Sequence, residues 1–143
     1  MAHASLADIG GYVKVVQGLP PLANVAATRN GASIDRRGYN SCVLVSHAGA
    51  VTGSPSAQAL DVKLQDSADG TTFADISTSI VTAAFSQKTT GTAELRELNI
   101  PLEGVRRYVR VVEVVGSFTG GTSPTFPHSA CVVLGGKDTL PAT

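Results

Sequence analysis

The segment Leu60–Gln65 constrains the fold most, because apolar and polar residues alternate strictly along it. Leu60, Val62 and Leu64 fall on one side of an extended chain, and the three polar residues between them fall on the other. A few residues later, Asp69-Gly70 supplies the positive φ that a tight hairpin turn requires. The pattern predicts a half-buried strand followed by a turn and a return strand.

Longer apolar runs predict further strands. Ser41–Ser46 is apolar without alternation, which is typical of a strand that is covered on both faces. Tyr108–Val115 is rich in β-branched residues, and Phe126–Leu134 forms the last apolar run. Ser77–Gly91 is expected to hold one irregular strand and a loop. Glu94–Ile100 is either a helical turn that ends at the following proline or a strand with a bulge.

Together these segments predict an all-β fold with seven or eight strands and no extended helix. Their spacing, with turn residues between them, fits an antiparallel β-sandwich or jelly-roll. The chain of 143 residues is long enough for one such domain, which we place at residues 33–143.

Residues 1–32 are expected to form an extended N-terminal arm, because glycine, proline and asparagine break up their apolar residues. The arm lies either across its own domain or across a neighbouring molecule. If it reaches a neighbour, deleting residues 1–25 would leave a folded domain that no longer binds its partner. Its apolar side chains are the candidate contacts with a subunit or a capsid: Tyr12, Leu19, Pro20, Pro21, Leu22 and Val25.

Charge argues against nucleic acid as a partner. Eleven basic and eleven acidic residues give no net charge, and only 15% of the residues are charged. A neutral, weakly charged surface lacks the basic footprint of a nucleic-acid binder and favours self-association. No apolar run approaches the roughly 18 residues that would span a membrane. The N-terminus does not resemble a signal peptide, so synthesis and folding in a cytoplasm are expected.

No catalytic or metal-binding motif is recognisable. The sequence has no Gly-x-Ser-x-Gly element, and His3, His47 and His128 have no acidic partner at an informative spacing. We therefore expect no enzyme activity, no cofactor and no metal. Cys42 and Cys131 lie in apolar runs and are expected to be reduced core thiols; whether they are paired stays open.

Four motifs carry a family resemblance through their order: Asp35–Ser41, Leu64–Ile76, Gly104–Arg110 and Ser129–Gly135. In this order they resemble small virion structural proteins of tailed bacteriophages, of the capsid decoration (cement) type. The resemblance covers residues 34–136 and leaves out the N-terminal arm.

The resemblance implies a decoration protein that binds the outer surface of the head shell and stabilises it through inter-subunit contacts. It implies the major capsid protein as partner, assembly as a homotrimer, and a place on the capsid surface of the virion. A tail or head–tail connector protein is an alternative with the same fold. A carbohydrate-binding module is disfavoured, because the sequence has no tryptophan and its three tyrosines are scattered.

Overall fold

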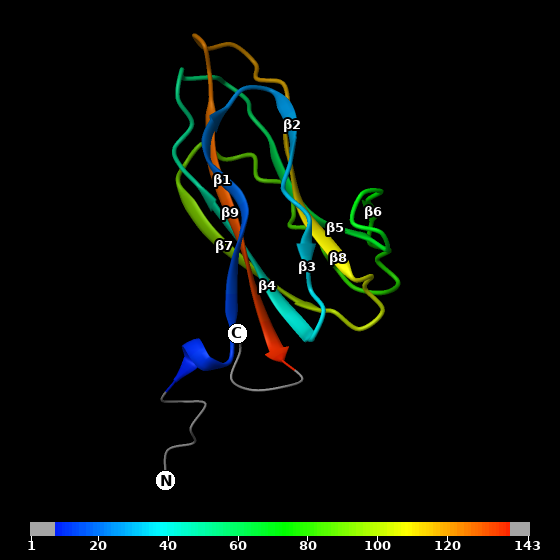
Figure 1. Ribbon diagram of the computed structural model, residues 1–143. Helices are drawn as coiled ribbons and strands as arrows, with labels where there is room; N and C mark the ends of the chain where they lie inside the picture. The colour runs from blue at the N-terminus through cyan, green and yellow to red at the C-terminus, as the bar shows by residue number, and fades with distance from the viewer. Residues whose placement is uncertain (1–7, 138–143) are drawn as a thin grey trace.

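The computed structural model describes residues 8–137. This range holds one short 3-10 helix and nine strands (Figure 1): η1 (Ile9–Gly11), β1 (Lys14–Asn24), β2 (Ala27–Asn30), β3 (Ile34–Asp35), β4 (Tyr39–Ala48), β5 (Leu60–Ser67), β6 (Ala74–Asp75), β7 (Glu94–Pro101), β8 (Tyr108–Val115) and β9 (Phe126–Lys137). Two of the strands, β3 and β6, have two residues each, so seven longer strands carry the fold. No helix in this range is long and apolar enough to cross a membrane.

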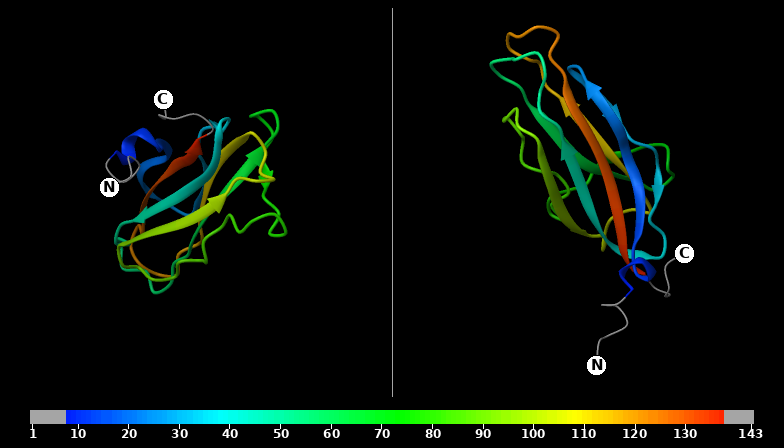
Figure 2. Two further views of the ribbon diagram at one scale, coloured as in Figure 1. Left: turned by 90° about the horizontal axis from the view of Figure 1, so that it is seen from below. Right: turned by 90° about the vertical axis from the view of Figure 1, so that its left-hand side faces the viewer.

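The strands form two antiparallel sheets. Sheet A has the order β1-β9-β4-β7, and sheet B has the order β2-β8-β5-β6, with β3 also paired to β8. The sheets lie face to face, as the two views of Figure 2 show. Side chains from the inner faces fill the space between them, with Leu44, Leu60, Val109 and Phe126 fully buried. The predicted all-β sandwich is confirmed.

The N-terminal segment belongs to the sandwich. β1 pairs with β9 from Lys14↔Leu134 to Asn24↔Phe126, and β2 pairs with β8. Leu19 is only 1% exposed, because its side chain lies in the core between the sheets. Of the two alternatives for residues 1–32, the described part therefore lies in its own domain, and the predicted division at residue 32 is corrected.

The correction extends to the expected effect of deleting residues 1–25. Such a deletion removes all of β1, which pairs along most of β9, and opens the core around Leu19. A deletion of this kind is now expected to damage the fold rather than to remove a docking arm.

Two expectations for the middle of the chain also change. β7 is a regular strand, and its register with β4 runs from Ala48↔Glu94 to Ser41↔Pro101 without the predicted bulge. Ser77–Gly91 contains no strand. Part of it follows the edge of β5, where Leu64 N–H donates to the Ala83 carbonyl at 2.8 Å.

The predicted turn after Leu60–Gln65 is present. Gly70 has a φ of 77°, and the Asp69 carboxylate accepts backbone N–H bonds from Thr72 at 2.8 Å and Thr71 at 2.9 Å. These bonds hold the pKa of Asp69 well below its usual range. The short strand β6 then returns beside β5, with Asp66 opposite Ala74.

Candidate functional site: the outer face of sheet A

The central strands of sheet A are apolar on both of their faces. Along β4, Cys42 and Leu44 point into the core, whereas Val43 and Val45 point away from it and are half-buried. The outer side chains of β9 follow the same pattern, with Cys131 and Val133 half-buried between buried neighbours. The continuous apolar run at Ser41–Ser46 predicted a strand with other parts of the protein packed against both of its faces. Within residues 8–137, no element covers the outer one.

The strand registers bring these outer residues into rows across the sheet. Two successive rows, each read from β1 through β9 and β4 to β7, contain Val15, Val133, Val43 and Asn99, and then Gln17, Cys131, Val45 and Glu97. Glu97 is the only charged residue in the two rows. Next to them lies Leu95, which is 66% exposed although its side chain is large and apolar.

The outer face of sheet B has a different character. There, Lys63 forms an ion pair with Asp75 at 2.8 Å, Arg110 donates to Gln65 at 2.8 Å, and Gln87 donates to Asp61 at 2.9 Å. A polar outer face is what an antiparallel sandwich normally presents to water. The contrast within one molecule singles out the outer face of sheet A as the candidate contact surface.

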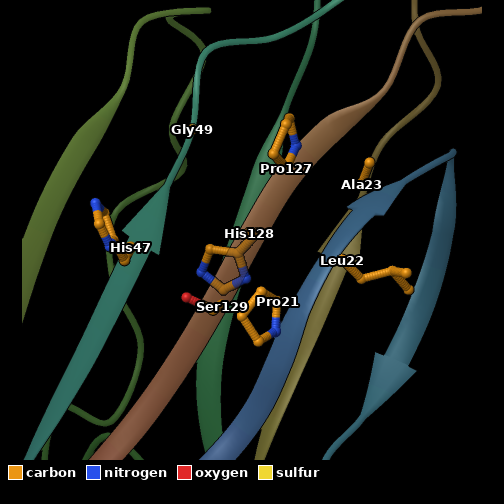
Figure 3. A pocket seen from close by; sticks show the side chains of 8 residues that line it. All are labelled: Pro21, Leu22, Ala23, His47, Gly49, Pro127, His128 and Ser129. Atoms are coloured by element: carbon orange, nitrogen blue, oxygen red, sulfur yellow. The ribbon is translucent and has the colours of Figure 1, made fainter.

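Three hollows lie on this face. The first, of about 470 Å³, lies between Pro21 of β1, His47 of β4 and Ser129 of β9. Figure 3 shows its lining from these three strands. A second, of about 390 Å³, adjoins it and includes Val45 and Leu95. The third, of about 490 Å³, lies at the opposite end of the sheet beside Tyr12.

The structure separates the candidate contact residues into different places. Leu19 is buried, so it does not contact a partner, and its prediction as a contact is corrected. Pro21 and Leu22 line the first hollow, and Tyr12 lines the third. Pro20 is exposed on β1, and Val25, in the turn between β1 and β2, is 62% exposed. The exposed candidates thus border the outer face of sheet A at its β1 side, whereas its centre is made by residues of β4 and β9.

The inside of the sandwich contains a polar cluster that the sequence did not reveal. The His128 ring donates through Nδ1 to the Glu113 carboxylate, and Ser46 Oγ lies 2.8 Å from His128 Nε2. Arg29 Nη2 is 3.1 Å from the same oxygen of Glu113. Arg29 also donates to the carbonyls of Pro20 at 2.6 Å and His128 at 3.1 Å. No motif spacing pointed to this pairing, because Glu113 and His128 lie on different strands of different sheets.

This cluster has the order of groups found in a Ser-His-acid triad, but its position is unsuited to catalysis. Ser46 is 1% exposed and faces the opposite sheet, so a substrate has no access to its hydroxyl. The cluster links β4 and β9 of sheet A to β8 and β2 of sheet B. We assign it a structural role as a polar connection between the sheets. Among residues 8–137, no group of three potential ligands lies together in a way that would hold a metal ion.

The two thiols lie on opposite faces of sheet A and are unpaired. Cys42 is a core residue, as predicted, and burial raises its pKa to about 12. Cys131 faces outward and is half-buried, and burial also raises its pKa. The prediction of a core thiol is thus wrong for Cys131.

We expect maleimide to modify Cys131 in the folded protein and to leave Cys42 unmodified until the protein unfolds, because the thiolate is the reactive form. Burial of Cys42 also predicts a loss of stability in alkali. The contribution of the buried, neutral Cys42 thiol to the free energy of unfolding is complete below pH 9, the usual thiol pKa. It is lost as the pH rises towards the raised pKa of about 12. Mass spectrometry of labelled peptides and urea unfolding at pH 8 and pH 10.5 test the two statements. Fast labelling of Cys42 in the native protein would contradict them.

Comparisons with known proteins give a fold but no family. No family model matches the chain, and no curated protein matches it by sequence. Among solved structures, the infectious bursal disease virus Gx strain matches with a TM-score of 0.54 at 15% identity, over 90% of this chain and 33% of that one. The VP2 subviral particle of the same virus matches with a TM-score of 0.52 at 18% identity, over 87% and 32%.

A third structure, the SPBc2 prophage-derived protein YomS, has a TM-score of 0.45 at 10% identity, over 85% of this chain and 91% of that one. The present chain spans about a third of the viral chains, so it corresponds to one part of each of them. At these identities the viral matches establish a shared β-sandwich architecture.

Proposed function

We propose that this chain is a virion structural protein without enzymatic activity, and more specifically a bacteriophage capsid decoration protein. It binds the outer surface of the head shell, through the major capsid protein, with the outer face of sheet A. The observation that carries the proposal is the unpartnered apolar face made by β4 and β9, on a domain whose other outer face is polar. The order of the sequence motifs and the fold shared with virus structures support it.

Such a face suits a protein that acts by adhesion. Burying apolar surface contributes about 25 cal/mol for each Å², without requiring any reactive group. A shell offers many equivalent positions, so a modest contribution from each copy adds up over the particle. The near absence of charge on the face means that little desolvation of charged groups opposes the contact.

The carbohydrate-binding alternative loses further support from the tyrosines. Tyr39 is buried, and Tyr12 and Tyr108 are half-buried on different parts of the fold. Arg107 lies over the Tyr108 ring at 4.9 Å, and Lys137 lies over the Tyr39 ring at 5.5 Å. These rings do not form the exposed aromatic platform on which a sugar stacks.

The stoichiometry of the chain in virions tests the proposal. We expect gradient-purified particles from the source to contain the chain in a fixed, large proportion to the major capsid protein, when both are quantified by mass spectrometry. A few copies in each particle would overturn the decoration role in favour of a tail or connector position. Complete absence from particles would overturn the virion role itself.

A pair of matched substitutions tests which face binds. We expect Val45→Glu to reduce binding to purified shells by at least tenfold, because it places a carboxylate in the centre of the apolar face. The control is Val114→Glu, which introduces the same change at a half-buried residue on the outer face of sheet B. Cosedimentation with shells that lack the chain measures both. Equal binding by the two variants would show that sheet A does not form the contact.

A further inference from the structure

Strand β7 leaves one edge of sheet A open. It pairs with β4 on one side and has no strand on the other. Just beyond its end, Leu102 N–H donates to the Asn40 carbonyl at 2.9 Å. This bond identifies Leu102 as a residue whose backbone groups point towards β4. Because these groups alternate along an antiparallel strand, Leu98 and Ile100 bond to β4, while Leu95, Glu97 and Asn99 direct theirs outward.

The open edge is a regular array of hydrogen-bonding groups. It presents the N–H and C=O groups of Leu95, Glu97 and Asn99 and the C=O group of Pro101. None of these has a backbone partner in the part of the chain that the structure describes. Proteins usually protect such edges, because an unpaired strand of this length accepts another strand.

The other edges of the described sandwich are protected or short. On β1, Pro20 and Pro21 lack N–H groups, the register shifts twice, and Arg29 occupies the Pro20 carbonyl. On β5, the strand β6 and the segment around Ala83 cover the edge. Strand β2 has four residues, half the length of β7.

We propose that β7 pairs antiparallel with β7 of a second copy of this chain, with Glu97 opposite Asn99 of the partner subunit. The contact has two-fold symmetry, because identical strand edges that pair antiparallel are related by an axis perpendicular to the sheet. The proposed assembly is therefore a dimer, in place of the homotrimer that the sequence resemblance implies. It joins two copies of sheet A into one sheet of eight strands.

Charge selects this register. Two symmetric registers each allow about six backbone hydrogen bonds between the outward groups. One of them places Glu97 directly opposite its own copy, and like charges in that position are destabilising. The other places Glu97 opposite an Asn99 amide, which can donate to the carboxylate, and Leu95 beside the proline of the partner strand. The second register is therefore the one we propose.

The dimer also gives the apolar outer face of sheet A a wider contact area in terms of the proposed function, on which this step rests. An axis perpendicular to the sheet leaves the outer faces of both copies pointing in the same direction. The pair therefore presents one continuous apolar surface, twice as wide as that of a single chain, towards a shell. Two linked faces bind more tightly than one, because the second contact forms within the same complex.

The mass of the purified protein in solution tests the pairing. We expect light scattering after size exclusion to give about twice the chain mass of 14.6 kDa. Asn99→Pro removes one outward N–H group and leaves the hydrogen bonds to β4 intact, so this variant should be a monomer with an unchanged circular dichroism spectrum. The control is Thr28→Pro, which removes an outward N–H group from the edge strand β2 and should remain a dimer.

Several results would overturn the proposal: a native monomer, a native trimer, a dimer that survives Asn99→Pro, or dissociation in both proline variants. A cross-linking experiment gives a readout that does not depend on proline being tolerated. In the proposed register, Leu98 lies opposite its own copy in a pair without hydrogen bonds, where the Cα atoms are about 4.5 Å apart. This separation permits a disulfide.

We therefore expect Leu98→Cys to form a covalent dimer under mild oxidation. Leu95→Cys is the control, since its two copies would lie about 20 Å apart along the strands. Cross-linking through position 95, or through neither position, would refute the register. Shell binding is measured separately: a dimer that does not bind shells leaves this inference standing and refutes the proposed function. A monomer that binds shells does the reverse.

Discussion

Replacing Glu113 by alanine is expected to lower the free energy of unfolding by about 3–5 kcal/mol, the usual loss when one partner of a buried charge pair is removed. The carboxylate is fully buried and interacts with both Arg29 and His128. Without it, the guanidinium loses its counter-charge, and the imidazole loses the acceptor for Nδ1. The same change leaves a cavity between the sheets.

Glu113→Gln provides the matched control, because it preserves the size of the side chain and removes its charge. We expect a smaller loss, about 1–3 kcal/mol, since a neutral amide forms weaker hydrogen bonds with both partners. Urea unfolding at neutral pH, followed by circular dichroism, measures the two variants. If Glu113→Ala lost less than about 1 kcal/mol, the cluster would not be the connection between the sheets that we describe.

Replacing Leu19 by alanine is expected to cost about 2–5 kcal/mol, as is usual for a buried leucine. Leu19 belongs to the segment expected to be an arm, yet its side chain lies in the core. The substitution therefore distinguishes an integral strand from a docking segment: a strand residue changes the free energy of unfolding, whereas a docking residue changes only partner binding.

Val15→Ala is the control on the same strand. Val15 is 66% exposed on the outer face of sheet A, so its truncation should change the free energy of unfolding by less than about 0.5 kcal/mol. Thermal and urea unfolding of the two variants give the comparison. Equal stability of Leu19→Ala and the unaltered protein would mean that β1 contributes little to the core.

The parts of the fold that were predicted correctly depend on short-range patterns. The alternation at Leu60–Gln65 and the turn at Asp69-Gly70 are complete within a few residues, so the sequence shows them directly. The location of β1 depends on its pairing with β9, more than 100 residues away. Its glycines and prolines suggested an irregular segment, and only the partner strand shows that they are the bulges of an edge strand.

The candidate site was predictable in part for the same reason. The continuous apolar run at Ser41–Ser46 predicted a strand with apolar side chains on both faces. The apolar side chains on the outer side of this strand are what distinguish the outer face of sheet A. Its neighbours in the rows, such as Val15 and Leu95, come from β1 and β7, and only the register brings them together. The link between His128 and Glu113 crosses from one sheet to the other, so no local spacing reveals it.

The position of β9 in sheet A has a consequence for how the chain folds. This strand follows all the others in the described sequence, yet it lies between β1 and β4. During synthesis, β1 therefore has no partner in its own sheet until β9 emerges, and the two halves of sheet A remain apart. Pairing β1 with β9 closes a loop that contains all the strands between them, which is slow and entropically costly. The rate-limiting step of folding should therefore be the insertion of β9. Until that step is complete, the nascent chain exposes unpaired strands that favour aggregation.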